Sequence, residues 1–110
     1  MMKKNNDSEA SKPGQPLIDS LIHAPARFKI MSNLYLVGWV DFLFLQNLTG
    51  LTRGNLSSHL TRLEKAEYVL IKKEFIGKIS HTTISMSDKG HKAFNIYREN
   101  LKKLLEDIPE

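Results

Sequence analysis

The stretch LTGLTRGNLSSHLTRLEKAEYV, residues 48–69, constrains this chain more than any other. Its apolar residues recur at i, i+4 and i+7, which makes one stripe of a helix face a core: Leu56, Leu60 and Leu63. Gly50 supplies a tight turn before the helix. Thr52 is placed to cap the helix, because its side-chain oxygen can accept a free backbone N–H of the first turn. The pattern therefore predicts a turn followed by an amphipathic helix over about residues 52–66.

The opposite face of this helix carries short polar and basic side chains. Hydroxyl, amide, imidazole and guanidinium groups can donate to phosphates and base edges without repelling a polyanion. The local acidic residues, Glu64 and Glu67, come late in the helix. The helix start also carries a partial positive charge that suits a phosphate. The candidate DNA-binding residues are Thr52, Arg53, Asn55, Ser57, Ser58, His59, Thr61, Arg62 and Lys65. An amphipathic helix with an ordinary solvated face is the alternative interpretation.

Two runs rich in β-branched and aromatic residues follow, at 68–75 and 81–86, around the turn material Ile76-Gly77-Lys78. They predict a β-hairpin over about residues 69–86. Its basic residues are expected on the arms and tip, where they would touch a sugar-phosphate backbone: Lys72, Lys73, Lys78 and His81. Lysines on an exposed hairpin also prevent edge-to-edge aggregation, so a purely structural role is the alternative for each of them.

The run L-T-x-G-N-L-S-S-H-L-x-x-L-E-x-A-x-Y-V, Leu51 to Val69, resembles the recognition helix of winged-helix transcriptional regulators, the broad MarR- and ArsR-like group. That family's pattern also includes Ile22–Arg27 and Thr83–Gly90, so the resemblance covers roughly Leu17 to Leu105. It implies a mainly α fold with a small β-hairpin (α+β), a winged helix-turn-helix. Glu67 departs from the pattern, because the family usually has glycine there, and the turn must accommodate a side chain.

Composition limits the number of domains and the kinds of partner. A chain of 110 residues with 41% hydrophobic residues can bury one core and hardly two. The net charge is +4, and residues 52–81 hold six cations against three anions, whereas residues 87–110 hold five of each. The basic excess therefore lies on the predicted helix and hairpin, as suits a nucleic-acid partner.

Several chemistries find no support in the sequence. There are no cysteines, and the four histidines show no metal-ligand spacing, so we expect no metal site. The chain has no glycine-rich phosphate loop, nucleophile elbow or paired carboxylates, and we predict neither an enzyme nor a cofactor. No apolar run is long enough to span a bilayer, and no signal peptide is visible, so we expect a cytoplasmic protein with no membrane contact.

The N-terminal part is predicted to lead into two helices. Residues 1–15 lack apolar periodicity and are expected to be a disordered tail, which leaves 16–110 as the domain. Apolar spacing from Leu17 past Pro25 predicts one long, kinked helix, with a buried side of Phe28, Met31, Leu34 and Tyr35. His23, beside the proline, is either a ligand-sensing or a packing residue. Residues 38–40 suggest a short strand. Asp41 should cap a second helix whose covered apolar residues are Phe42, Leu45, Leu48 and, on a second face, Phe44.

The last helix should begin at Ser87, as N-cap, and carry an apolar seam with spacings of 3, 4, 3 and 4. We expect this seam and the first apolar segment to form a dimer interface, made of Leu17, Ile18, Leu21, Ile22, Phe94, Tyr97, Leu101, Leu104 and Ile108. The alternative is that the seam packs only on its own domain.

Together these features predict a homodimeric, sequence-specific regulator of transcription that binds double-stranded DNA. Helix 52–66 would enter the major groove and hairpin 69–86 would touch the backbone. The sequence identifies no effector ligand. The alternative from another class is a winged-helix module that binds proteins and not DNA, since a fold alone does not fix function.

Overall fold

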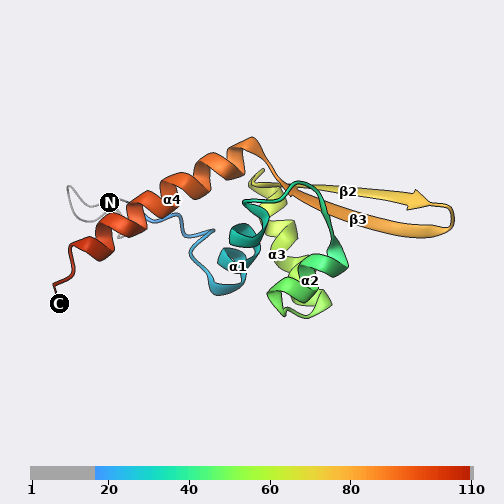
Figure 1. The fold of residues 1–110 in the computed structure, drawn as a ribbon, viewed down its shortest axis with the longest axis horizontal. Coiled ribbons are helices and arrows are strands. Elements are labelled where there is room, and N and C mark those ends of the chain that lie inside the picture. The colour runs from blue at the N-terminus through green and yellow to red at the C-terminus, as the bar shows by residue number, and fades with distance from the viewer. Residues whose placement is uncertain (1–16, 110) are drawn as a thin grey trace, which may run out of the picture.

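The computed structural model describes residues 17–109 and arranges them as four helices and a three-stranded antiparallel sheet (Figure 1). The elements are α1 Pro25–Leu34, β1 Val40–Asp41, α2 Phe42–Thr49, α3 Arg53–Lys65, β2 Val69–Ile76, β3 Ile79–Met86 and α4 Asp88–Glu106. The prediction of a mainly α fold with a small hairpin is confirmed. The short strand suggested at residues 38–40 is also present, shifted to Val40–Asp41 as β1, and the sheet order is β1-β3-β2. The tail predicted for residues 1–15 lies outside the described residues.

The core is formed where α1, α3, the inner end of the hairpin and the start of α4 meet. Its fully buried side chains include Ile30, Met31, Leu34, Leu45, Leu56, Leu60, Leu63, Val69 and Ile84. The two long strands pair antiparallel from Val69↔Met86 to Ile76↔Ile79. Beyond Ile71 every residue of β2 is exposed. The outer part of the hairpin therefore projects away from the helices, as Figure 1 shows.

The first helix begins at Pro25, and the prediction of a long kinked helix from Leu17 is wrong. The Asp19 carboxylate accepts the backbone N–H groups of Leu21 (2.9 Å) and Ile22 (3.2 Å), a local turn that competes with helical hydrogen bonding. Ala24 precedes the proline and is extended, with φ −141°. The proline then occupies a first-turn position, where its missing N–H costs nothing.

The second helix is capped as expected but buries a different stripe. The Asp41 carboxylate accepts the Phe44 N–H at 2.9 Å. The buried residues are Leu45 and Thr49, one turn apart, and the Thr49 hydroxyl donates to the Leu45 carbonyl at 2.9 Å. Three apolar residues that were predicted to be covered are exposed: Leu48, Phe44 and, on α1, Phe28. The prediction for these three was therefore wrong. Within residues 17–109, no helix or strand covers the outer side of α2.

The junction between α3 and β2 accommodates Glu67 at φ +65°. The Tyr68 N–H donates to the Leu63 carbonyl and the Glu67 N–H to the Glu64 carbonyl, both at 2.9 Å, which is the Schellman pattern. A non-glycine residue in this left-handed conformation is strained by about 1–2 kcal/mol. Glu67, where the family usually has glycine, therefore raises the conformational energy of the turn but does not change its geometry.

The last helix is fastened to the same junction. Ser87, its predicted N-cap, accepts the Gly90 N–H at 2.9 Å and donates to the Glu67 carbonyl at 2.6 Å. Gly90 is buried, and a Cβ there would overlap the Tyr68 carbonyl oxygen. α4 can therefore approach the start of β2 only because this residue has no side chain.

Candidate nucleic-acid interface

Helices α2 and α3 are joined by a three-residue turn, Gly50 to Thr52, the connection of a helix-turn-helix. Gly50 takes φ +72°, and the Thr52 hydroxyl oxygen accepts the Asn55 N–H at 3.1 Å, so both predicted roles are confirmed. Lys29 of α1 donates to the Thr49 carbonyl at 3.2 Å, at the C-terminal end of α2. The turn is thereby held from the side of α1 as well as by its own caps.

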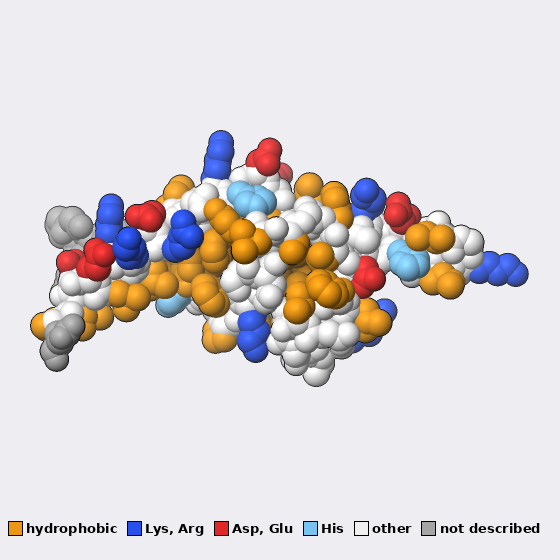
Figure 2. Space-filling view, in the orientation of Figure 1, with side chains coloured by type: hydrophobic (Ala, Val, Ile, Leu, Met, Phe, Trp, Pro, Cys, Tyr) orange, Lys and Arg blue, Asp and Glu red, His pale blue; other side chains and the backbone are white. Residues whose placement is uncertain are grey.

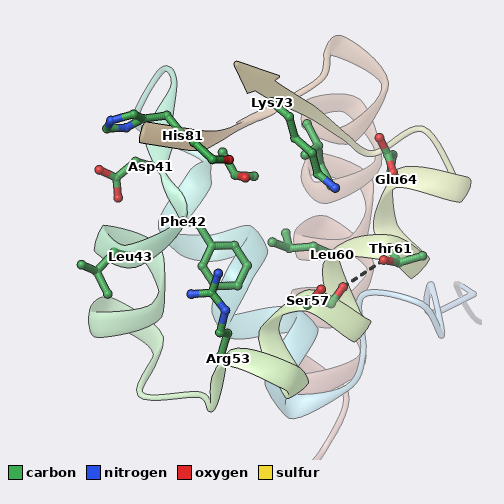
Figure 3. Close-up of a pocket in the computed structure, with 13 residues that line it drawn as sticks. Asp41, Phe42, Leu43, Arg53, Ser57, Leu60, Thr61, Glu64, Lys73 and His81 are labelled. Atoms are coloured by element: carbon green, nitrogen blue, oxygen red, sulfur yellow. Dashed lines mark hydrogen bonds between the residues drawn. The ribbon is translucent and has the colours of Figure 1, made fainter. Parts of the chain in front are cut away.

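The outer face of α3 is exposed, while its three leucines are buried. The exposed candidates are Thr52, Arg53, Asn55, Ser57, Ser58, Thr61, Arg62 and Lys65. His59 is half-buried. The Thr61 hydroxyl donates to the Ser57 carbonyl at 3.0 Å, so its proton is used within the helix and its oxygen can still accept a hydrogen bond (Figure 3). Asn55, Ser58, Arg62 and Lys65 are exposed side chains on this face that can offer donors and acceptors to a partner.

Arg27 of α1 supports this helix from behind, a role that was not predicted from the sequence. Its side chain is 8% exposed; Nε donates to the Leu21 carbonyl at 2.5 Å, and a terminal nitrogen lies 3.2 Å from Nδ1 of His59. Burial, followed by the charges of Arg27 and Arg62, lowers the pKa of His59 below its usual 6.5. Arg27 lies three residues before the buried Ile30, and this helical spacing could have predicted that Arg27 also faces the core.

A groove of about 760 Å³ separates α3 from the hairpin, with the start of α2 as its floor (Figure 3). The Arg53 guanidinium lies 5.3 Å from the centre of the Phe42 ring at one end. Lys73 extends from β2 toward α3 on the other side. The lining also includes Glu64 and Asp41, so the groove is of mixed charge.

The hairpin lysines do not share one surface. Because successive strand residues point to opposite faces, Lys73 lines the groove while Lys72 lies on the other face, with its ammonium 4.5 Å from the centre of the Trp39 ring. Lys78 follows Gly77 in the two-residue turn. His81, half-buried, borders the groove, but it pairs with Glu74, the residue after Lys73, so its ring points away from the groove (Figure 3).

Large apolar side chains surround the end of the hairpin. They are strongly exposed: Phe75 (75%), Ile76 (61%) and Ile79 (65%). Figure 2 shows hydrophobic side chains at this end, with a basic one beyond them. From the sequence these residues were expected only as strand and turn formers, and an apolar tip was not predicted.

The predicted dimer residues fall into two groups. Ile22, Phe94 and Tyr97 are buried in the core of this chain, so they are not available at its surface. The Tyr97 hydroxyl lies 3.0 Å from Nδ1 of His23, which gives that histidine a packing partner. The other predicted dimer residues lie in two places, in the segment before α1 and along the outer part of α4. On α4, Leu101 and Leu105 line a shallow apolar groove.

These remaining residues differ in how exposed they are. Ile18, Leu21, Leu101 and Leu104 are partly covered, while Leu17 and Ile108 are exposed, the latter beyond the end of α4. Figure 2 shows hydrophobic side chains along the lower edge of this helix and charged ones along its upper side.

No helix within residues 17–109 is long and apolar enough to cross a membrane. In the same range, no three His, Cys, Asp or Glu side chains are grouped so that they could hold a metal ion.

Residues 26–105 match the family model of the winged helix DNA-binding domain. The chain belongs to this family. It is 33% identical over 88 residues to an uncharacterised protein of Methanocaldococcus jannaschii, covering 80% of this chain and 96% of that one. Among solved structures, the transcriptional regulator homologue of Pyrococcus horikoshii OT3 is 27% identical, with a TM-score of 0.75, and the match covers 82% of this chain and 91% of that one.

A putative regulator of the MarR family from Porphyromonas gingivalis W83 shares the fold at 16% identity, with a TM-score of 0.63 and coverage of 81% and 86% of the two chains. The family and the fold of this winged-helix protein are those of DNA-binding transcriptional regulators and not of enzymes.

Proposed function

We propose that this winged-helix protein is a cytoplasmic, sequence-specific regulator that reads double-stranded DNA with α3 in the major groove. The observation that carries the proposal is the exposed outer face of α3, where donors and acceptors are presented on the second helix of a helix-turn-helix. Ser58 and Arg62 lie one turn apart on that face. A helix fits the width of the major groove, and such side chains can reach base edges there.

The hairpin would add contacts to the DNA backbone. Lys73 faces the groove beside α3, so it is placed for the phosphate strand that borders the major groove. Lys78 stands at the exposed end of the hairpin. Phosphate contacts position a protein on the duplex without carrying sequence information.

We propose further that the protein acts as a homodimer joined through the outer part of α4. Leu105 is 59% exposed and Ile108 is 64% exposed, and both are large apolar side chains. Two copies related by a two-fold axis would present their α3 helices to half-sites about one DNA turn, roughly 34 Å, apart. Such a dimer would read a palindromic site.

A protein-binding role without DNA is the second candidate, and the apolar end of the hairpin favours it. Phe75, Ile76 and Ile79 would give a protein partner an exposed apolar contact. The two functions differ in their response to salt, because release of counterions from DNA makes binding fall steeply as salt rises.

The experiment that tests the proposal is the affinity for a random-sequence duplex at several salt concentrations, followed by selection of preferred sites. DNA binding predicts a linear log–log dependence with a steep negative slope. The double variant Ser58→Ala/Arg62→Ala should lose about 1–3 kcal/mol of binding at the preferred site and become less selective at one position. Lys92→Ala, the loss of an exposed cation in the first half of α4, is the charge-matched control. Both variants should keep the wild-type melting temperature, since the altered side chains are exposed. A flat salt response favours the protein-binding role.

A further inference from the structure

Arg27 and His59 form a polar contact between the inner side of α1 and the recognition helix α3. The distance from an Arg27 terminal nitrogen to Nδ1 of His59 is 3.2 Å. The guanidinium has only donors and stays protonated in proteins, so the histidine nitrogen has to accept. This requirement identifies which ring nitrogen lacks a proton.

The proton of a neutral His59 must then be on Nε2. A neutral imidazole carries one N–H, and the other nitrogen is an acceptor. The opposite tautomer, and the doubly protonated ring, would both direct an N–H at the Arg27 guanidinium. Arg27 therefore favours a single neutral form of His59 whose remaining donor is Nε2–H.

His59 lies on the flank of α3 that faces α1, between two other candidate DNA contacts. Asn55 precedes it by four residues and Arg62 follows it by three, so the three side chains form one row along the helix. The ring is half-buried, and within residues 17–109 the structure gives Nε2 no hydrogen-bond partner. The charged groups near the ring are Arg27 on α1 and Arg62 on α3.

We propose that Arg27 is a positioning residue that fixes His59 as a neutral Nε2–H donor, and that this donor contacts an acceptor of the bound DNA. The acceptor is a base edge or a phosphate oxygen. The contact does not require His59 to be charged, so it persists above neutral pH. The donor role rests on the proposed DNA binding, whereas the tautomer is a property of the free protein.

Nitrogen-15 NMR of the histidine rings in the free full-length protein tests the tautomer without DNA. His59 signals are assigned by their loss in His59→Gln. The expected result is a deprotonated Nδ1 and a protonated Nε2 at about pH 7.5, where a neutral imidazole prevails. In Arg27→Met, which removes the donor, the two tautomers should mix. A wild-type ring protonated on Nδ1, or a tautomer ratio unchanged by Arg27→Met, overturns the assignment.

DNA binding tests the donor, with site preference measured on a randomised duplex pool. His59→Leu should weaken binding about fivefold or more, the scale of one lost base contact. His59→Gln can accept from Arg27 and still donate, so it should bind like the wild type at both about pH 6 and about pH 8. Both substitutions leave the core leucines unchanged, and melting curves check the fold of each variant.

The pattern of the loss identifies the acceptor. Loss confined to one position of the site indicates a base edge, and an equal loss on all sequences indicates a phosphate. If His59→Leu binds like the wild type, the donor role is overturned while DNA binding itself stands. If the wild-type protein binds no duplex, both the donor role and the proposed function fail, and the tautomer is still decided by the spectrum.

Discussion

Lys72 and Lys73 are adjacent in β2 but should respond differently to substitution in DNA-binding assays. Lys73 lines the groove beside α3, whereas Lys72 lies on the opposite face against the Trp39 ring. Lys73→Ala should therefore remove a phosphate contact, and Lys72→Ala should not. The two variants lose the same charge from neighbouring positions, so a difference between them reports geometry and not net charge.

The size of the effect follows from counterion release. One phosphate contact contributes about 0.9 to the slope of log affinity against log salt. Between about 50 mM and about 200 mM salt, a fourfold range, the affinity ratio of wild type to Lys73→Ala should fall by about 3.5-fold. For Lys72→Ala the ratio should stay constant. Loss of its contact with Trp39 should instead cost about 0.5–1 kcal/mol of folding stability.

Fluorescence anisotropy with a labelled random-sequence duplex gives the slopes, and urea denaturation gives the stabilities. Equal slopes for both variants would show that the two lysines are equivalent, and the assignment of faces to DNA and to Trp39 would fail. A slope change in Lys72→Ala alone would mean that the opposite face of the hairpin meets DNA.

Three further predictions concern folding and assembly. Gly90→Ala should lower the free energy of unfolding in urea by about 1–3 kcal/mol, because its Cβ would overlap the Tyr68 carbonyl oxygen. Gly54→Ala, at an exposed helical position with open space, should instead raise it by up to about 1 kcal/mol. Equal effects of the two changes would refute the close approach of α4 to the start of β2. Leu105→Glu should shift a dimer toward monomers in sedimentation. Ile96→Glu, at an exposed position on the opposite face of α4, should not. A wild-type protein that is monomeric at tens of micromolar, roughly the range for a weak dimer, would rule out the interface. Burial and hydrogen bonding raise the pKa of Tyr68 from 10.0 to about 12. Because the folded state keeps a proton that the unfolded state loses, stability should fall as pH rises from about 10 to about 12. An absorbance titration that places the pKa of this tyrosine near 10 would contradict that.

Local signals in the sequence were sufficient for the helix-turn-helix. Leu56 and Leu60 recur at helical spacing, and Thr52 and Ser87 are short polar residues at the helix starts. These features act within one or two turns of the chain. The long first helix was predicted wrongly because apolar spacing alone does not show that the Asp19 carboxylate takes the backbone donors.

The functional surface was only partly predictable, because contacts between distant segments shape it. Strand alternation alone would have separated Lys72 from Lys73, but the contact of Lys72 with Trp39 depends on the path of β1. Likewise, the sequence placed His59 on α3 but could not show that Arg27 lies behind it. Such pairings depend on how the elements pack, which residue spacing within one element does not specify.

The claim that α3 reads a specific DNA sequence can be examined by selection from a pool of randomised duplexes with the full chain, followed by sequencing. We expect an enriched site with two similar half-sites related by two-fold symmetry and spaced by about one helical turn. Repeating the selection with Arg62→Ala should relax the preference within each half-site. Recovery of an unenriched pool from wild-type protein that is folded by circular dichroism would contradict the claim.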